Sequence, residues 1–182
     1  MGLRVAFLRG MNLGGRRISN ADLRAEFEAL GFEEVTTFRA SGNVIFESNV
    51  RAEAELVAEI EAGLHAALGY SVPTFLRTEA EMREIAIREP FEPSRVKASE
   101  GKHQVSILSR QPSDAQRRKV LAMATDADPL VVEGREVHWL PSGGLLESEL
   151  DLDAIEELVG PSTRRTMGTI EGIVAKLPSR DG

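Results

Sequence analysis

The order in which strands and helices are expected to follow one another constrains the fold more than any single motif. Strands show apolar residues in alternation or in short runs, and helices show them three or four positions apart. In chain order, the first expected elements are a strand at 4–9, a helix at 19–30, strands at 35–39 and 44–47, a helix at 52–68 and a strand at 72–77. The last strand contains Pro73, which cannot donate to a strand ladder and therefore predicts a sheet edge.

The same order returns in the second half of the chain. After a helix and a proline-broken connection over 78–102, we expect a strand at 103–109, a helix opened by the capping box of Ser113 and Gln116, and a hairpin at 130–140. A last helix is expected from about Thr166. The order predicts an α+β fold of two ferredoxin-like (β-α-β-β-α-β) subdomains in tandem with extra C-terminal helices. Their expected bounds are 1–77 and 103–177, with a connection at 78–102 and a flexible tail at 178–182.

Composition narrows the class of protein. The chain has 182 residues, with 22 Lys and Arg against 29 Asp and Glu, and a net charge of −7. The absence of cysteine excludes disulfides, thiolate metal sites and cysteine nucleophiles, and it favours a cytoplasmic location. We expect no signal peptide, because only a few apolar residues precede Arg9, and no membrane span, because no apolar stretch approaches ~20 residues. The acidic balance argues against nucleic-acid binding, which needs clustered Lys and Arg.

The loop after the first strand is the strongest candidate site. It reads Arg9-Gly10-Met11-Asn12-Leu13-Gly14-Gly15-Arg16-Arg17 and precedes a helix. Glycines allow backbone N–H groups to converge on an anion, a helix N-terminus favours negative charge, and arginine forks onto phosphate or carboxylate. Arg16 and Arg17 stand where a P-loop has Lys and Ser or Thr, so the loop is not a P-loop. The alternative is a structural turn with solvated arginines.

Two further segments would complete an anion site if the fold brings them near this loop. Ser41 and Asn43 offer a hydroxyl and an amide, although Ser-Gly-Asn is also a favoured turn. Thr163 and Arg165 precede the last expected helix, where they would bind a phosphate or only cap the helix. The predicted ligand-binding residues are therefore Arg9, Gly10, Asn12, Gly14, Gly15, Arg16, Ser41, Asn43, Thr163 and Arg165.

Other chemistry has less support. His65, His103 and His138 lack metal-ligand spacing, so we expect no metal and no cofactor. No nucleophile elbow is present, and no catalytic residue can be assigned. The acidic run at 147–157 predicts a solvated helix face, with a surface for a basic partner as the alternative. Three functions stay open: binding of a small anionic ligand, a protein–protein interaction or regulatory module, and an enzyme acting on a phosphorylated substrate. A homo-oligomer also stays open as a partner.

Several segments carry the motifs of a known family. They are Leu8-Arg9-Gly10-Met11-Asn12-Leu13-Gly14-Gly15, Ile18-Ser19, Leu30-Gly31-Phe32 and Ser41-Gly42-Asn43-Val44-Ile45-Phe46. Together they resemble the domain of unknown function 1697 family of bacterial proteins. The resemblance implies a pair of ferredoxin-like subdomains and no assigned activity. The family usually has Arg-Asn-Trp-Asn-Thr where this chain has Arg165-Thr166-Met167-Gly168-Thr169, so a function carried by that segment would be altered here.

Overall fold

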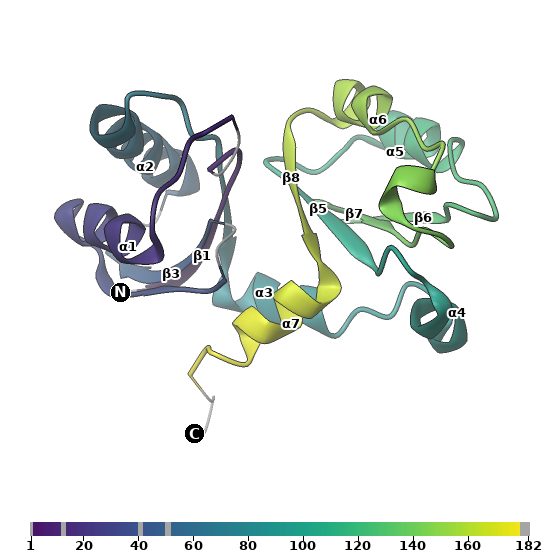
Figure 1. Ribbon diagram of the computed structural model, residues 1–182, viewed down its shortest axis with the longest axis horizontal. Coiled ribbons are helices and arrows are strands. Elements are labelled where there is room, and N and C mark those ends of the chain that lie inside the picture. Colours follow the sequence, from purple (N-terminus) through teal and green to yellow (C-terminus); the bar gives the residue numbers. More distant parts are fainter. Residues whose placement is uncertain (1, 12–13, 40–41, 50–51, 179–182) are drawn as a thin grey trace. The chain divides into compact units, whose positions relative to one another are not determined.

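Two four-stranded antiparallel sheets, one in each half of the chain, form a mixed α/β framework (Figure 1). The chain divides into two units, Met1–Arg83 and Glu84–Gly182. None of the helices described is long and apolar enough to cross a membrane. The computed structural model describes residues 2–11, 14–39, 42–49 and 52–178.

In the first unit, two helices cover one face of the sheet. The elements are β1 (Gly2–Leu8), α1 (Asn20–Ala29), β2 (Glu33–Thr37), β3 (Asn43–Ser48), α2 (Glu53–Leu68) and β4 (Thr74–Thr78). The sheet order is β2-β3-β1-β4, which puts β4 at an edge directly after Pro73. Side chains of both helices and of the sheet form one core, in which the rings of Phe27, Phe32 and Phe46 lie 4.7 to 5.8 Å apart between centroids.

The helix ends of this unit follow local chemistry. The Ser19 hydroxyl accepts the N–H of Asp22 at 3.0 Å, which satisfies one of the unpaired donors at the start of α1. Gly69 ends α2 with a φ of 78°, a left-handed conformation that glycine adopts without steric cost. Both ends agree with the prediction from the sequence.

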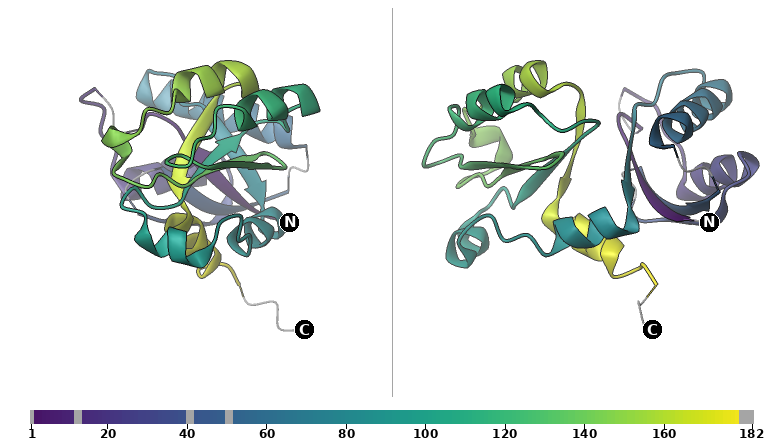
Figure 2. Two further views of the ribbon diagram at one scale, coloured as in Figure 1. Left: turned by 90° about the vertical axis from the view of Figure 1, so that its right-hand side faces the viewer. Right: turned by 180° about the vertical axis from the view of Figure 1, so that it is seen from behind.

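In the second unit, the sheet has the order β6-β7-β5-β8. Its strands are β5 (Gln104–Leu108), β6 (Leu130–Glu133), β7 (Glu136–Trp139) and β8 (Ser162–Thr166). Helices α5 (Asp114–Leu121) and α6 (Leu152–Val159) pack side by side over one face, and the short helices α4 (Pro93–Ala98) and α7 (Met167–Val174) lie on the opposite side (Figures 1 and 2). A 3₁₀ turn (Leu145–Glu147) precedes α6, and α3 (Glu79–Ala86) runs across the division between the units.

Two elements of this unit were not predicted. The sequence predicts that the segment before the last helix binds a phosphate or caps that helix, but Ser162–Thr166 forms β8 and pairs with β5. It lacks an apolar run because it is an edge strand built from Ser, Thr and Arg. Thr166 also caps α7, since its hydroxyl accepts the N–H of Thr169 at 3.2 Å. Pro93 does not break the chain but begins α4, where the missing N–H costs nothing.

Candidate functional site

The predicted anion loop lies in the first unit and is built on glycine. Gly10, Gly14 and Gly15 have φ values of 75°, 61° and 82°. Arg16 is exposed, and its guanidinium carbon lies 4.2 Å from the centroid of the Tyr70 ring. The backbone N–H of Arg9 donates to the carbonyl of Pro73, the residue before β4, at 3.0 Å. Asn12 and Ser41, two of the predicted ligands, lie outside the described residues.

Local hydrogen bonds use several groups near this loop. Besides accepting the N–H of Asp22, the Ser19 hydroxyl donates to its carboxylate at 2.6 Å, so a negative charge already occupies the first turn of α1. Asn43 is fully buried, and its side-chain amide donates to the carbonyl of Phe38 at 2.9 Å. This bond closes the turn between β2 and β3.

The remaining predicted ligands, Thr163 and Arg165, lie on β8 in the second unit. Arg165 donates to the Thr163 hydroxyl at 2.8 Å and to the carbonyl of Arg164 at 2.9 Å. Burial lowers the pKa of Arg165 from 12.5 to about 10. The predicted ligands thus belong to two units, and a composite site made from both stays a prediction.

The second unit contains a cavity that no motif of the sequence indicates. Its volume is about 390 Å³, within the range of small-molecule sites. The segment before α4, α4 itself, the residues that lead into β5 and the first turns of α7 line it. Phe91, Val96 and Met167 make its walls apolar, and Lys97 and Lys102 add ammonium groups.

Beside this cavity, the first turn of α7 has one N–H without a hydrogen-bond partner among the described residues. The N–H of Met167 donates to the carbonyl of His103 at 2.8 Å, and the N–H of Thr169 is capped by Thr166. Between them, the N–H of Gly168 has no hydrogen-bond partner among the described residues. Gly168 lines the cavity and is exposed, so this N–H is available to a ligand.

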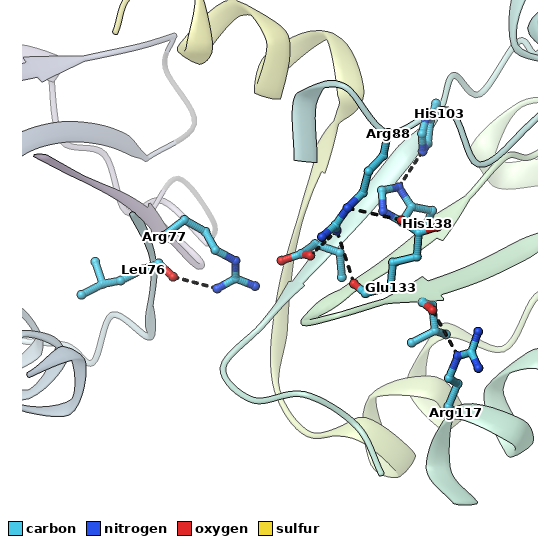
Figure 3. A network of polar contacts seen from close by, with 9 residues as sticks. Leu76, Arg77, Arg88, His103, Arg117, Glu133 and His138 are labelled. Atoms are coloured by element: carbon cyan, nitrogen blue, oxygen red, sulfur yellow. Dashed lines mark hydrogen bonds and ion pairs between the residues drawn. The ribbon is translucent and has the colours of Figure 1, made fainter. Parts of the chain in front are cut away.

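Two histidines at the cavity hydrogen-bond to one another (Figure 3). His103 Nε2 lies 2.9 Å from His138 Nδ1, and the ring of Phe91 meets the His103 ring edge-on at 5.1 Å. His103 lines the cavity at 7% exposure. His138 is fully buried, and its Nε2 has no partner within the described structure.

Both imidazoles are neutral at pH 7. Burial lowers the pKa of His103 from 6.5 to about 4. Burial, the neighbouring His103 and then Arg88 lower the pKa of His138 from 6.5 to about 3. A neutral imidazole carries one N–H and one bare nitrogen, so the pair can hydrogen-bond in only two arrangements.

The residues of this site are far apart in the sequence. His103 and His138 meet because β5 pairs with β7, with Val105 opposite His138. The only signal in the sequence is that both histidines fall at strands that were expected to be in the same subdomain. Periodicity does not say which strands of a subdomain pair, so the sequence alone does not indicate that the two imidazoles lie together.

Arg88 lies beside this pair and is committed to two carboxylates. Its Nη1 donates to Glu136 Oε2, and its Nε lies 3.3 Å from Glu133 Oε2. The Glu136 side chain is only 4% exposed. Figure 3 shows the Arg88 side chain next to the imidazole of His138. Although Arg88 also lines the cavity, its charge is neutralised within the protein.

The acidic segment borders a different cavity, of about 400 Å³. Asp128 in its lining is buried and accepts from Trp139 Nε1 at 2.8 Å and from the Ser148 hydroxyl at 2.7 Å. Its carboxylate therefore serves the local structure. Across the described ranges, no group of three or more His, Asp or Glu residues is placed to hold a metal ion.

Comparisons with known proteins give a family and a fold. The model of a family described as "Protein of unknown function (DUF1697)" matches residues 1–138. No curated protein matches the chain. Among solved structures, it is similar to the conserved bacterial protein SP0830 from Streptococcus pneumoniae, with 17% identity and a TM-score of 0.69 over 97% of this chain and 99% of that one. At this identity, the likeness shows the fold alone.

Proposed function

This chain belongs to the DUF1697 family, and we propose that it binds a small anionic ligand in the cavity of its second unit. One observation carries the proposal: the cavity combines apolar walls with a backbone donor that no group of the described protein uses, the N–H of Gly168. Small-molecule sites have this composition, an apolar lining with a few polar groups that orient the ligand. A backbone N–H at a helix start is a natural partner for negative charge.

The lysines of the lining support an anion over a neutral ligand. Lys97 and Lys102 form no ion pair with any described residue, and both are exposed. Lys102 has a φ of 62°, which costs about 1 kcal/mol or more for a residue other than glycine. Backbone strain of this kind is concentrated at functional sites. At Lys102 it is consistent with an ammonium group that binds an anion in the cavity.

A leucine at position 168 tests the proposal. A Cβ on Gly168 would meet only the Thr166 hydroxyl, at 3.9 Å, and Gly168 lines the cavity, so we expect a leucine side chain to fit there and to fill part of the cavity. We expect Gly168→Leu to keep or raise the unfolding midpoint, because leucine has the higher helix propensity, and to abolish ligand binding. Thermal shift against nucleotides, sugar phosphates and carboxylates measures this, since a ligand at 100 times its Kd stabilises by about 2.7 kcal/mol.

The control for this variant is Ala175→Leu, which adds the same side chain to an exposed position at the other end of α7. It should bind as the wild type does. No shift of the wild-type protein with any anion would contradict the proposal.

The loop at 9–17 is a second candidate for the same class of ligand. The observation that supports the loop is that Arg16 and Arg17 are both exposed and form no ion pair with a described residue, so both guanidinium groups are accessible to an anion. The same screen on Arg16→Ala separates the two sites. A shift lost in Gly168→Leu and kept in Arg16→Ala is the expected result, and the reverse pattern would move the site to the loop.

We also infer that each unit contains a ferredoxin-like subdomain, 1–77 in the first and 103–177 in the second, with 78–102 as the connection between the two subdomains. The strand orders β2-β3-β1-β4 and β6-β7-β5-β8 are equivalent, and each sheet is built in the succession β-α-β-β-α-β, which supports this inference.

A further inference from the structure

The histidine pair carries a more specific inference, which rests on the proposed function. We propose that His103 presents its Nδ1–H to the cavity, and that the anionic group it receives there with Gly168 N–H is a carboxylate, not a phosphate, on a ligand with an apolar body.

The unpartnered nitrogen of His138 selects between the two arrangements of the pair. If His103 donated from Nε2, the proton of His138 would sit on Nε2, as a fully buried N–H without an acceptor. If His138 donates from Nδ1, its Nε2 is only a bare nitrogen. Buried N–H groups without a partner are the rarer and costlier case. The second arrangement is therefore favoured, and it leaves the proton of His103 on Nδ1.

With this arrangement of protons, the polar groups that His103 and Gly168 leave for a ligand are both hydrogen-bond donors. His103 Nε2 is used by His138, so Nδ1–H is the ring donor left for a ligand. The bond from Met167 N–H to the carbonyl of His103 ties the start of α7 to the same residue, and His103 and Gly168 both line the cavity. One donor from each residue would match the two oxygens of one carboxylate.

A phosphate would find too few partners here. It presents three acceptor oxygens and a charge of about −1.5 to −2. Among the described residues, the start of α7 has a single unused N–H, and the carboxylates of Glu89 and Glu171, in the same lining as the lysines, would repel a doubly charged group more strongly than a singly charged one. A singly charged group needs less compensation, and a carboxylate is such a group.

The walls define the rest of the ligand. Phe91, Val96 and Met167 line the cavity, and the Phe91 ring stands at 80° to that of His103. An aromatic or branched aliphatic body would bury its surface against these side chains. The ligand class is therefore an apolar monocarboxylate.

The protonation pattern is tested without any ligand. Long-range ¹⁵N–¹H correlation spectra of the imidazoles at pH 7 report which nitrogen of each ring carries the proton. We expect His103 and His138 both to be protonated on Nδ1, with the exposed His65 as the internal reference. A proton on Nε2 of His138 would overturn the inference, whatever binds in the cavity.

The carboxylate is tested with three probes that share one body: phenylacetate, phenylacetamide and benzylphosphonate. By titration calorimetry we expect phenylacetate to bind at least tenfold more tightly than the other two, and to lose at least tenfold in Gly168→Leu. Binding of benzylphosphonate at equal strength, lost in Gly168→Leu, would overturn the carboxylate and leave the proposed function standing. Absence of phenylacetate binding also overturns the inference that the ligand carries a carboxylate. The proposed function itself is contradicted only if no anion of the wider screen binds.

Discussion

Replacing Arg88 by alanine is expected to lower the free energy of unfolding of the second unit by about 3–5 kcal/mol at pH 7.5. The substitution removes the Arg88 cation from the carboxylate of Glu136, whose side chain is only 4% exposed, and it also removes the contact with Glu133. A buried carboxylate that loses a cationic partner keeps its desolvation cost and loses the attraction that offset it. Urea unfolding followed by fluorescence of Trp139, in the same unit, measures the change.

Two matched variants show whether the buried charge of Glu136 causes the loss of stability in Arg88→Ala. Arg88→Ala combined with Glu136→Leu removes both charges, and we expect it to recover most of the lost stability. Arg24→Ala breaks an exposed pair with Glu28, whose side chains are 58% and 46% exposed, and should cost less than about 1 kcal/mol. Equal losses in Arg88→Ala and Arg24→Ala would contradict the buried-pair account.

Lowering the pH from 7.5 to 5 is expected to remove about 4 kcal/mol of stability through the histidine pair, about 2 kcal/mol for each residue. Folding lowers the pKa of His103 to about 4 and that of His138 to about 3, whereas both are 6.5 in the unfolded chain. Between these values the unfolded state binds protons that the folded state does not. The stability of the neutral pair is therefore complete above pH 6.5 and is lost as the pH falls toward 4. Urea unfolding at a series of pH values measures the slope.

The control for this slope is the double variant His103→Gln with His138→Asn. Its amides stand in for the two bonded ring nitrogens but do not titrate in this range. We expect its stability to change much less between pH 7.5 and 5 than that of the wild type. If the stability of the wild type and of the double variant changed equally with pH, titratable groups other than the two histidines would cause the change.

Much of the fold could be predicted because the signals are local. A Ser19 or Ser113 cap acts within three residues of a helix start, and Gly69 ends a helix through its own φ. The elements that escaped prediction are those whose sequence is atypical for their type. Edge strand β8 has no apolar run, and α4 is a short helix that begins with proline.

The candidate site could be predicted much less well. Glycine and arginine in the loop at 9–17 predict an anion site, because clusters of these residue types are typical of anion-binding loops. The cavity instead depends on ordinary residues that the fold brings together, such as Phe91, Gly168 and His103. None of them stands in a motif with chemical meaning, so only their neighbours in space reveal their use.

The sequence by itself determined the order of most elements, though not β8 and α4, as well as most of the element ends, the family and the absence of thiol chemistry. Each of these depends on residue type or on spacing along the chain. The tertiary structure alone decided that His103 meets His138, that Arg88 is neutralised by Glu133 and Glu136, and that Gly168 keeps a free N–H beside an apolar cavity. The physical reason is the pairing of β5 with β7 and β8. A shift of one residue in either register would turn every side chain of a strand to the other face, and strand pairing between distant segments leaves no periodic mark in the chain.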